Sequence, residues 1–474
     1  MTPYTRRTGL ALILLALLDP IAAPAQTSNG EHWIATWGTA QQLARIPPPA
    51  AGRGAGAPAA PAANAQPAPA APAPPARPPA PAQSVAAGNA GRGAPQRRFG
   101  IPPALPGLSN QTIRMIARVS TGGRTVRVRL THALGATALP LGAAHLALRS
   151  TGSGIVPGSD RVLTFSRKPT ATLYAGQVLV SDPVTINLAP LADVVVSLYF
   201  PGETGTPTSH TFGLRPTYVS TTGDFTGAAE IADVAATMQS YYWLAGVDVL
   251  APADAGTIVT FGDSITDGDQ STPDSNRMWP SVLAARLQAN QGTARLGIVN
   301  AGISGNRILG DNNGGLARLT SHALSVPGVK WITLLEGIND ITGATRASAP
   351  GTPAPAFSAE TLIAAYGQVI ELAHLYGVKV IGCTITPYGG SGPFTDQGEA
   401  IRQAVNTWVR SSGAFDAVVD FDAATRDPQD PKRFRPEADS PDMLHPGDAG
   451  YTLMADAFEL GMFTRKSVPA GRKK

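Results

Sequence analysis

Four short polar clusters in the second half of the chain contain the residue types of a nucleophilic acyl-transfer site. They read GDSITDG at 262–268, NAGISGN at 300–306, EGIND at 336–340 and DMLHP at 442–446. A serine hydroxyl needs a base to take its proton, and that base needs an orienting partner. Asp442 lies three residues before His445, so one loop can bring the carboxylate to the imidazole. Ser264 would complete the catalytic trio as nucleophile.

The same clusters contain candidate donors for an oxyanion, which an acyl-transfer site must also stabilise. These are the backbone N–H groups of Ser264 and Gly305 and the side-chain amide of Asn339. Each cluster alone has an ordinary structural interpretation: a serine that caps a helix, a turn glycine, a helix cap at Asn339 and Asp340, or a loop salt bridge between Asp442 and His445. Their order and placement together favour the catalytic interpretation.

Alternating strands and helices predict the element that positions these clusters. From Gly256 to Phe463 short apolar runs (TIVTFG, LGIVNAG, KWITLLEG, VKVIGCTIT, DAVVDFD) alternate with helical stretches. The predicted helices are 279–288, 359–376, 397–411 and 449–460. Continuous apolar strands separated by helices are typical of a parallel sheet covered on both faces. Working residues gather at the carboxyl ends of such strands, where the first three clusters lie.

The preceding region, from Asn110 to about Val249, has a different pattern. In TVRVRLTHAL the apolar side chains of Val126, Val128 and Leu130 alternate with two arginines, which is the period of a half-buried strand. Similar short runs follow, separated by Gly, Pro and Asp. This spacing predicts an antiparallel β-sandwich or jelly roll.

The four clusters, in this order, closely resemble the conserved blocks of the SGNH/GDSL hydrolase superfamily. The resemblance implies a three-layer, flavodoxin-like α/β domain with a parallel sheet. It also implies Ser264 as nucleophile, His445 as base, Asp442 as its orienting acid, and Ser264, Gly305 and Asn339 as the oxyanion hole. The longer stretches GDSITDGDQSTPDSNRMWP and LEGINDI, with the β-rich region before them, resemble an exported, acetylxylan-esterase-like branch.

The termini carry signals of another kind. Arg6 and Arg7 precede the apolar run GLALILLALL, and Ala23-Pro24-Ala25 offers a cleavage site, so a signal peptide cut after Ala25 is expected.

Residues 47–82 contain 13 of the 43 prolines, a composition typical of disorder. We therefore divide the chain into a signal peptide (1–25), the start of a β-rich domain (26–46), a Pro/Ala-rich disordered insertion (47–104), a β-rich accessory domain (105–250), the catalytic domain (251–464) and a basic flexible tail (465–474).

Charge and the remaining motifs exclude several classes of protein. The formal net charge is +4, but six Arg within 45–98 and five basic residues from Arg465 onward exceed that value, so the folded part is acidic and nucleic acid is not an expected partner. No apolar run after the signal is long enough to span a bilayer. Neither a G-x-S-x-G elbow nor a zinc, phosphate or dinucleotide motif occurs in the catalytic half, and we expect no cofactor and no metal. Asp267-Gly268-Asp269 begins like a calcium loop but lacks the later ligands.

Several other residues have structural interpretations. Asp263 is expected to hold the nucleophile's loop through backbone hydrogen bonds, Trp279 to pack in the core and the lone Cys383 to lie in a buried strand. For Arg307 a substrate contact and a surface salt bridge both remain open. Six further histidines have no acidic partner at motif spacing and are interpreted as structural: His32, His132, His145, His210, His322 and His374.

The sequence thus predicts a secreted or periplasmic serine esterase that cleaves short acyl esters, with acetylated plant polysaccharide or oligosaccharide such as xylan as substrate. Two alternatives stay open. One is a broad short-chain, aryl or lipase-like esterase of small esters. The other is a carbohydrate-binding or surface protein with a vestigial hydrolase domain. Chain-length preference depends on the loops 342–358, 387–396 and 426–441, and the sequence leaves the oligomeric state open.

Overall fold

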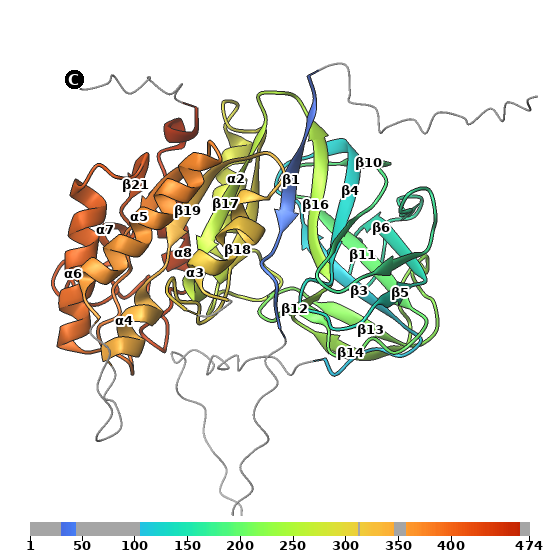
Figure 1. Cartoon of the computed structure of the whole chain (residues 1–474), viewed down its shortest axis with the longest axis horizontal. Coiled ribbons are helices and arrows are strands. Elements are labelled where there is room, and N and C mark those ends of the chain that lie inside the picture. Colours follow the sequence, from blue (N-terminus) through green and yellow to red (C-terminus); the bar gives the residue numbers. More distant parts are fainter. Residues whose placement is uncertain (1–29, 44–104, 311–312, 346–356, 465–474) are drawn as a thin grey trace, which may run out of the picture.

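The computed structural model describes residues 30–43, 105–310, 313–345 and 357–464. The predicted signal peptide, the Pro/Ala-rich insertion and the basic tail lie outside these residues. Two regions pack side by side (Figure 1): an α/β region, yellow-green to red, and a β-rich region, cyan to green. The first strand, in blue, runs between them.

A parallel sheet forms the centre of the α/β region. Its strands are β17 (Gly256–Gly262), β18 (Leu296–Gly302), β19 (Val329–Leu335), β20 (Lys379–Cys383) and β21 (Ala417–Val419). They lie in the order β18-β17-β19-β20-β21, and all neighbours are parallel. Every residue of β17 is buried, as expected for a strand covered on both faces. This is the doubly wound order of flavodoxin-like folds, so the carboxyl ends of β17, β18 and β19 meet at one edge.

Helices cover both faces of this sheet. The long ones are α2 (Trp279–Ala289), α5 (Ala359–Leu375), α6 (Asp396–Ser411) and α8 (Asp448–Asp456). Shorter segments are α1 (Ser264–Asp267), α3 (Gly315–Leu319), η1 (Thr320–Leu324), α4 (Ile338–Thr345), α7 (Phe421–Thr425) and η2 (Leu460–Phe463). One group packs α2 and α7 against α8, and the other packs α3 and α6 against α5. The predicted three-layer α/β domain is confirmed.

Two details of the α/β core refine the sequence predictions. Trp279 is fully buried and stacks on Phe458 with ring centroids 5.6 Å apart. The last helix was expected to reach residue 460, but it ends at Asp456. The chain turns there and places Phe458 against Trp279, so core packing overrides the helical periodicity. Cys383 ends β20 and is buried, and burial raises the pKa of its thiol.

The β-rich region is a sandwich of antiparallel sheets. One sheet has the order β14-β13-β3-β11-β6-β7 and the other β1-β16-β4-β10, with β9 also on β4; the pairs β2–β12, β12–β15 and β5–β8 form smaller sheets. The bounds are β1 (His32–Gly38), β2 (Gln42–Leu43), β3 (Gln111–Arg118), β4 (Gly123–Thr131), β5 (Leu139–Leu141), β6 (Ala143–Leu148), β7 (Arg161–Val162), β8 (Ala171–Leu173), β9 (Val178–Val180), β10 (Val184–Leu188), β11 (Asp193–Phe200), β12 (Thr208–His210), β13 (Thr217–Thr222), β14 (Val234–Met238), β15 (Tyr241–Tyr242) and β16 (Leu244–Ala251).

The predicted alternation in β4 is observed. Val126, Val128 and Leu130 are buried in the sandwich core. Arg127 and Arg129 point the other way, and each places its Nε 3.0 Å from a carboxylate oxygen of Asp248 on the neighbouring β16. The pattern of period two therefore separates a hydrophobic face from a charged one. The predicted sandwich is confirmed.

The two regions are joined along β18, the edge strand of the parallel sheet. Strand β1 pairs with β16 of the sandwich and also packs on β18, where Thr39 forms a parallel bridge with Asn300. The backbone N–H of Ile298 in β18 donates to Ser120 Oγ of the sandwich at 2.8 Å. The sandwich therefore satisfies hydrogen-bonding groups that an exposed sheet edge would leave open.

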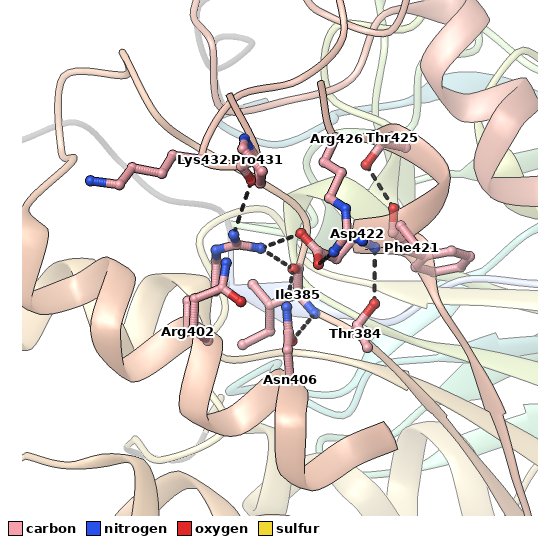
Figure 2. A network of polar contacts seen from close by, with 12 residues as sticks. Thr384, Ile385, Arg402, Asn406, Phe421, Asp422, Thr425, Arg426, Pro431 and Lys432 are labelled. Atoms are coloured by element: carbon pink, nitrogen blue, oxygen red, sulfur yellow. Dashed lines mark hydrogen bonds and ion pairs between the residues drawn. The ribbon is translucent and has the colours of Figure 1, made fainter. Parts of the chain in front are cut away.

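A buried network of polar contacts lies beside the carboxyl end of β20 (Figure 2). Arg402 of α6 has no exposed surface and donates to Glu399, to Asp422 of α7 and to the carbonyl of Ile385. Asn406 both donates to and accepts from the backbone of Ile385. The network ties α6 and α7 to the segment that follows β20.

Candidate active site

The four polar clusters meet at the carboxyl edge of the parallel sheet. Ser264 is the first residue of α1, directly after β17. Gly305 follows β18, and Asn339 lies in the first turn of α4, after β19. His445 and Asp442 lie on the loop before α8. The sheet topology brings these residues together across as many as 181 positions of sequence.

Ser264, His445 and Asp442 form a continuous hydrogen-bonded chain. The Ser264 Oγ lies 2.8 Å from His445 Nε2, and His445 Nδ1 lies 2.7 Å from Asp442 Oδ2. Ser264 and His445 are buried, with 5% and 8% of their surface exposed. The second oxygen of Asp442 accepts from the backbone N–H groups of Leu444 and His445 and from the Ser440 hydroxyl. The carboxylate is therefore fixed before it orients the imidazole.

The chemistry of the acceptors determines where the protons lie. An ionised carboxylate only accepts, so the proton on His445 belongs on Nδ1, and Nε2 is left to accept from the Ser264 hydroxyl. Burial alone would lower the pKa of His445, but the hydrogen bond with Asp442 and the charge of Asp269 raise that pKa above its ordinary 6.5. Burial would raise the pKa of Asp442, but its bonds to His445 hold that pKa far below the usual value. Asp442 is therefore ionised and can stabilise an imidazolium.

A short helical turn, α1, holds Ser264. Asp263 caps α1, because its side chain accepts from the N–H of Ile265. This is the backbone role that the sequence suggested. Gly262 allows the turn to pack closely: a Cβ there would lie 2.5 Å from the Leu335 carbonyl and 2.2 Å from the Thr266 hydroxyl. Burial raises the pKa of Asp263 to about 7.

The three candidate oxyanion donors surround the same turn. In the part of the chain that the structure describes, the backbone N–H groups of Ser264 and Gly305 donate to no other protein group. Gly305 has a φ of 76°, a conformation that glycine adopts most readily. The Asn339 amide donates one of its two hydrogens to the Asn306 carbonyl at 2.9 Å. That bond ties Asn339 to the loop of Gly305 and leaves its second N–H for a ligand.

Arg318 forms hydrogen bonds with the segments that carry these donors, a role that the sequence did not indicate. Its guanidinium donates to the carbonyls of Gly262 and Ala301, to the Asn306 side chain and to Glu336. It therefore connects the ends of β17, β18 and β19, and it is 2% exposed. It also lies 3.9 Å from the centre of the Phe261 ring. An arginine in the helical run GLARL carries no signal of such a role, because its partners come from three separate segments.

Two further acids near Ser264, Asp267 and Asp269, were not among the predicted site residues. Asp269 Oδ2 lies 3.8 Å from His445 Nε2. Burial raises the pKa of Asp269, while His445 opposes that shift. Asp267 pairs with His210, a histidine that the sequence placed among the structural ones. In the sequence, Asp267 and Asp269 stood out only as the start of a calcium-like loop. The described residues contain no group of three or more His, Cys, Asp or Glu arranged to hold a metal ion.

The match to one family model agrees with this picture. Residues 260–453 match the model of the GDSL-like Lipase/Acylhydrolase family. No curated protein matches the sequence. An acetylxylan esterase from Geobacillus stearothermophilus is similar at 21% identity, over 44% of this chain and 95% of that one, with a TM-score of 0.34. A GDSL-like lipase from Bacteroides thetaiotaomicron VPI-5482 has 17% identity, over 44% and 87% of the two chains, with a TM-score of 0.32.

Proposed function

We propose that this chain is an ester hydrolase that cleaves short acyl esters through a covalent acyl-enzyme on Ser264. The match of residues 260–453 to the GDSL-like Lipase/Acylhydrolase family supports this proposal. The observation that carries this proposal is the hydrogen-bonded chain from Ser264 through His445 to Asp442. A serine, an imidazole and an ionised carboxylate in this order are the groups that nucleophilic acyl transfer needs.

The proposed reaction has two halves. His445 Nε2 takes the hydroxyl proton as Ser264 Oγ attacks the ester carbonyl, and Asp442 stabilises the imidazolium that forms. The N–H groups of Ser264 and Gly305 and the Asn339 amide hold the oxyanion. His445 then gives its proton to the leaving alcohol. In the second half, water gives a proton to His445 and attacks the acyl-enzyme, and the acid is released as Ser264 recovers its proton.

The proposed substrate is an acetyl ester on a plant polysaccharide or oligosaccharide such as acetylated xylan. Its support is the resemblance of GDSITDGDQSTPDSNRMWP and LEGINDI to the acetylxylan-esterase-like branch. A polymer also fits export, because it cannot enter a cell. A broad esterase of small or aryl esters is the competing enzyme. A purely carbohydrate-binding role is disfavoured by the intact geometry around Ser264.

The decisive experiment measures acetate release from acetylated xylo-oligosaccharides, with p-nitrophenyl acetate assayed in parallel and Ser264→Ala as the blank. A large preference for the sugar ester supports the proposed substrate. Hydrolysis of the aryl ester alone retains the mechanism and moves the substrate to small esters. If neither ester is cleaved faster than by Ser264→Ala, the proposed acetylesterase is wrong.

Export is a second proposal, supported by the basic and apolar segment before Ala25. No helix in the described residues is long and apolar enough to cross a membrane. Mass spectrometry of the protein recovered outside the cytoplasm tests the cleavage site. A mature chain that begins at Gln26 is expected, and a protein that stays in the cytoplasm with Met1 intact would contradict export.

A further inference from the structure

A pocket that is open to solvent lies where the β-sandwich meets α2. Its apolar wall comes from both regions, with Trp37 and Phe212 from the sandwich side and Pro280 and Ala284 from α2. Ligand sites are often found at domain interfaces, with apolar walls and a few polar groups. Neither Ser264 nor His445 lines the pocket.

Arg118 gives the pocket a partly exposed positive group. Arg118 is one of the lining residues, its side chain is 36% exposed, and its guanidinium donates no hydrogen bond to any described residue. Arg118 forms a long ion pair with Asp193, with 3.9 Å between Nη1 and Oδ1. That oxygen is shielded from solvent, and the other oxygen of Asp193 is bound by Arg149 and Arg215. Arg118 therefore lines the pocket, whereas the carboxylate of Asp193 does not.

Two neutral donors face the same space. The side-chain amide nitrogen of Asn276 and the hydroxyl of Ser281 have no hydrogen-bond partner in the described part of the chain. Asn276 Oδ1 is already used, because it accepts from Arg215. Asp267 is the one carboxylate among the lining residues, and His210 is paired with it. The polar groups left for a ligand thus include one charged donor, one amide donor and hydroxyl groups and, among the described lining residues, no free carboxylate.

We propose that this pocket binds a carboxylate-bearing ligand, with Arg118 as its anion partner and the Trp37 side as its apolar wall. A planar guanidinium matches a carboxylate and can hold it with two parallel hydrogen bonds. An aromatic and aliphatic wall suits the less polar face of a sugar ring. The carboxylate comes either from a uronic acid residue of a glycan or from a free small organic acid.

Binding is measured by calorimetry on the full chain with Ser264→Ala, so that turnover cannot interfere and failure of the proposed esterase leaves the result interpretable. The probes are a xylo-oligosaccharide that carries one glucuronic acid, a neutral xylo-oligosaccharide of equal length, free glucuronate and free acetate. The acidic oligosaccharide or a free acid is expected to bind, and the neutral oligosaccharide to bind at least tenfold more weakly. When Arg118→Gln is introduced into the Ser264→Ala chain, the affinity for the acid is expected to fall about tenfold.

The matched control is Arg124→Gln, because Arg124 is exposed on β4 and does not line the pocket. Ser281→Leu is a second variant. It adds bulk on the pocket side of α2 and should also lower the affinity for the acid. Tighter binding of the acidic oligosaccharide identifies a glycan, whereas equally tight binding of glucuronate or acetate identifies a free acid. Equal binding of acidic and neutral probes, absence of binding, or equal effects of Arg118→Gln and Arg124→Gln would overturn the proposal.

Discussion

His210 of the β-sandwich and Asp267 of the nucleophile's turn form a buried pair, with Nε2 2.9 Å from Oδ1. His210 Nδ1 lies 2.8 Å from the Ala40 carbonyl, which can only accept, so Nδ1 carries a proton. Burial would lower the pKa of His210, but the charge of Asp267 raises that pKa above its ordinary value. The other oxygen of Asp267 accepts from the N–H of Ser304, the residue before Gly305. The sandwich therefore supports the oxyanion loop through one carboxylate.

Replacing His210 should therefore damage catalysis although it lies outside the catalytic chain. In His210→Gln the carboxylate of Asp267 loses its charged partner, and the loop of Ser304 and Gly305 is no longer held in place. Small misplacements of catalytic groups are costly, so we expect kcat to fall by about tenfold to a hundredfold while KM changes little. Steady-state kinetics on p-nitrophenyl acetate measure both values.

His145→Gln is the matched control for this variant. His145 also pairs with an aspartate, Asp160, at 2.8 Å, but this pair lies in the sandwich on β6. If His145→Gln reduces kcat as much as His210→Gln does, the effect is general destabilisation and the positioning role is wrong. The double variant His210→Gln with Asp267→Asn removes the unpaired charge and should recover part of the lost thermal stability.

Asp442→Asn should remove most of the activity while the fold stays intact. An amide at this position cannot stabilise the imidazolium, and it favours the wrong tautomer of His445. In serine hydrolases with this arrangement the corresponding change lowers kcat by about 10⁴. Asp439→Asn serves as the control, because Asp439 lies on the same loop and its carboxylate accepts from the backbone of Ser440. Similar kcat values for the two variants would exclude Asp442 as the orienting acid.

Local patterns were sufficient to predict the parallel sheet and to single out Ser264, His445 and Asp442, which the structure places in contact. Asp442 and His445 are three residues apart on one loop, and Ser264, Gly305 and Asn339 each follow a strand of one parallel sheet. Since the carboxyl ends of such strands share an edge, position along the chain is enough to bring these residues together.

The supporting contacts follow no local pattern, which is why they could not be predicted. His210 and Asp267 are 57 positions apart and belong to different regions. Arg318 lies in an ordinary helical run, and its importance comes from carbonyls and side chains at the ends of three strands. The dual packing of β1 on the sandwich and on β18 likewise depends on how the two regions dock.

Asn339→Ala tests the oxyanion hole. Loss of one preorganised donor should lower kcat by about 10² to 10³. The variant also loses the bond from Asn339 to the Asn306 carbonyl, so its thermal unfolding should be measured beside its kinetics. Asn290→Ala, at the end of α2, is a control away from the site. Unchanged kcat in Asn339→Ala would remove this residue from the oxyanion hole.

The Arg402 network should contribute strongly to stability. In Arg402→Met, two buried carboxylates, Glu399 and Asp422, lose their shared partner. Breaking a buried ion pair from one side typically costs about 3–5 kcal/mol. Lys432→Met is the control, since the pair of Lys432 with Asp396 lies at the surface and should contribute about 1 kcal/mol or less. Denaturant unfolding measures both values, and equal losses would contradict a special role for the network.

The activity of the enzyme should fall on acidification at a pH set by His445. His445 acts as a base only when neutral, so activity is lost as the pH falls through its pKa. Burial lowers that pKa, but Asp442 and Asp269 outweigh burial and raise it, which places the acid limb of kcat/KM above pH 6.5. Asp269→Asn removes one of the charges that stabilise the imidazolium, so the limb should move to lower pH. Asp254→Asn changes an exposed surface acid and should leave the limb in place. A limb that stays unchanged or moves to higher pH in Asp269→Asn would mean that Asp269 does not stabilise the protonated base.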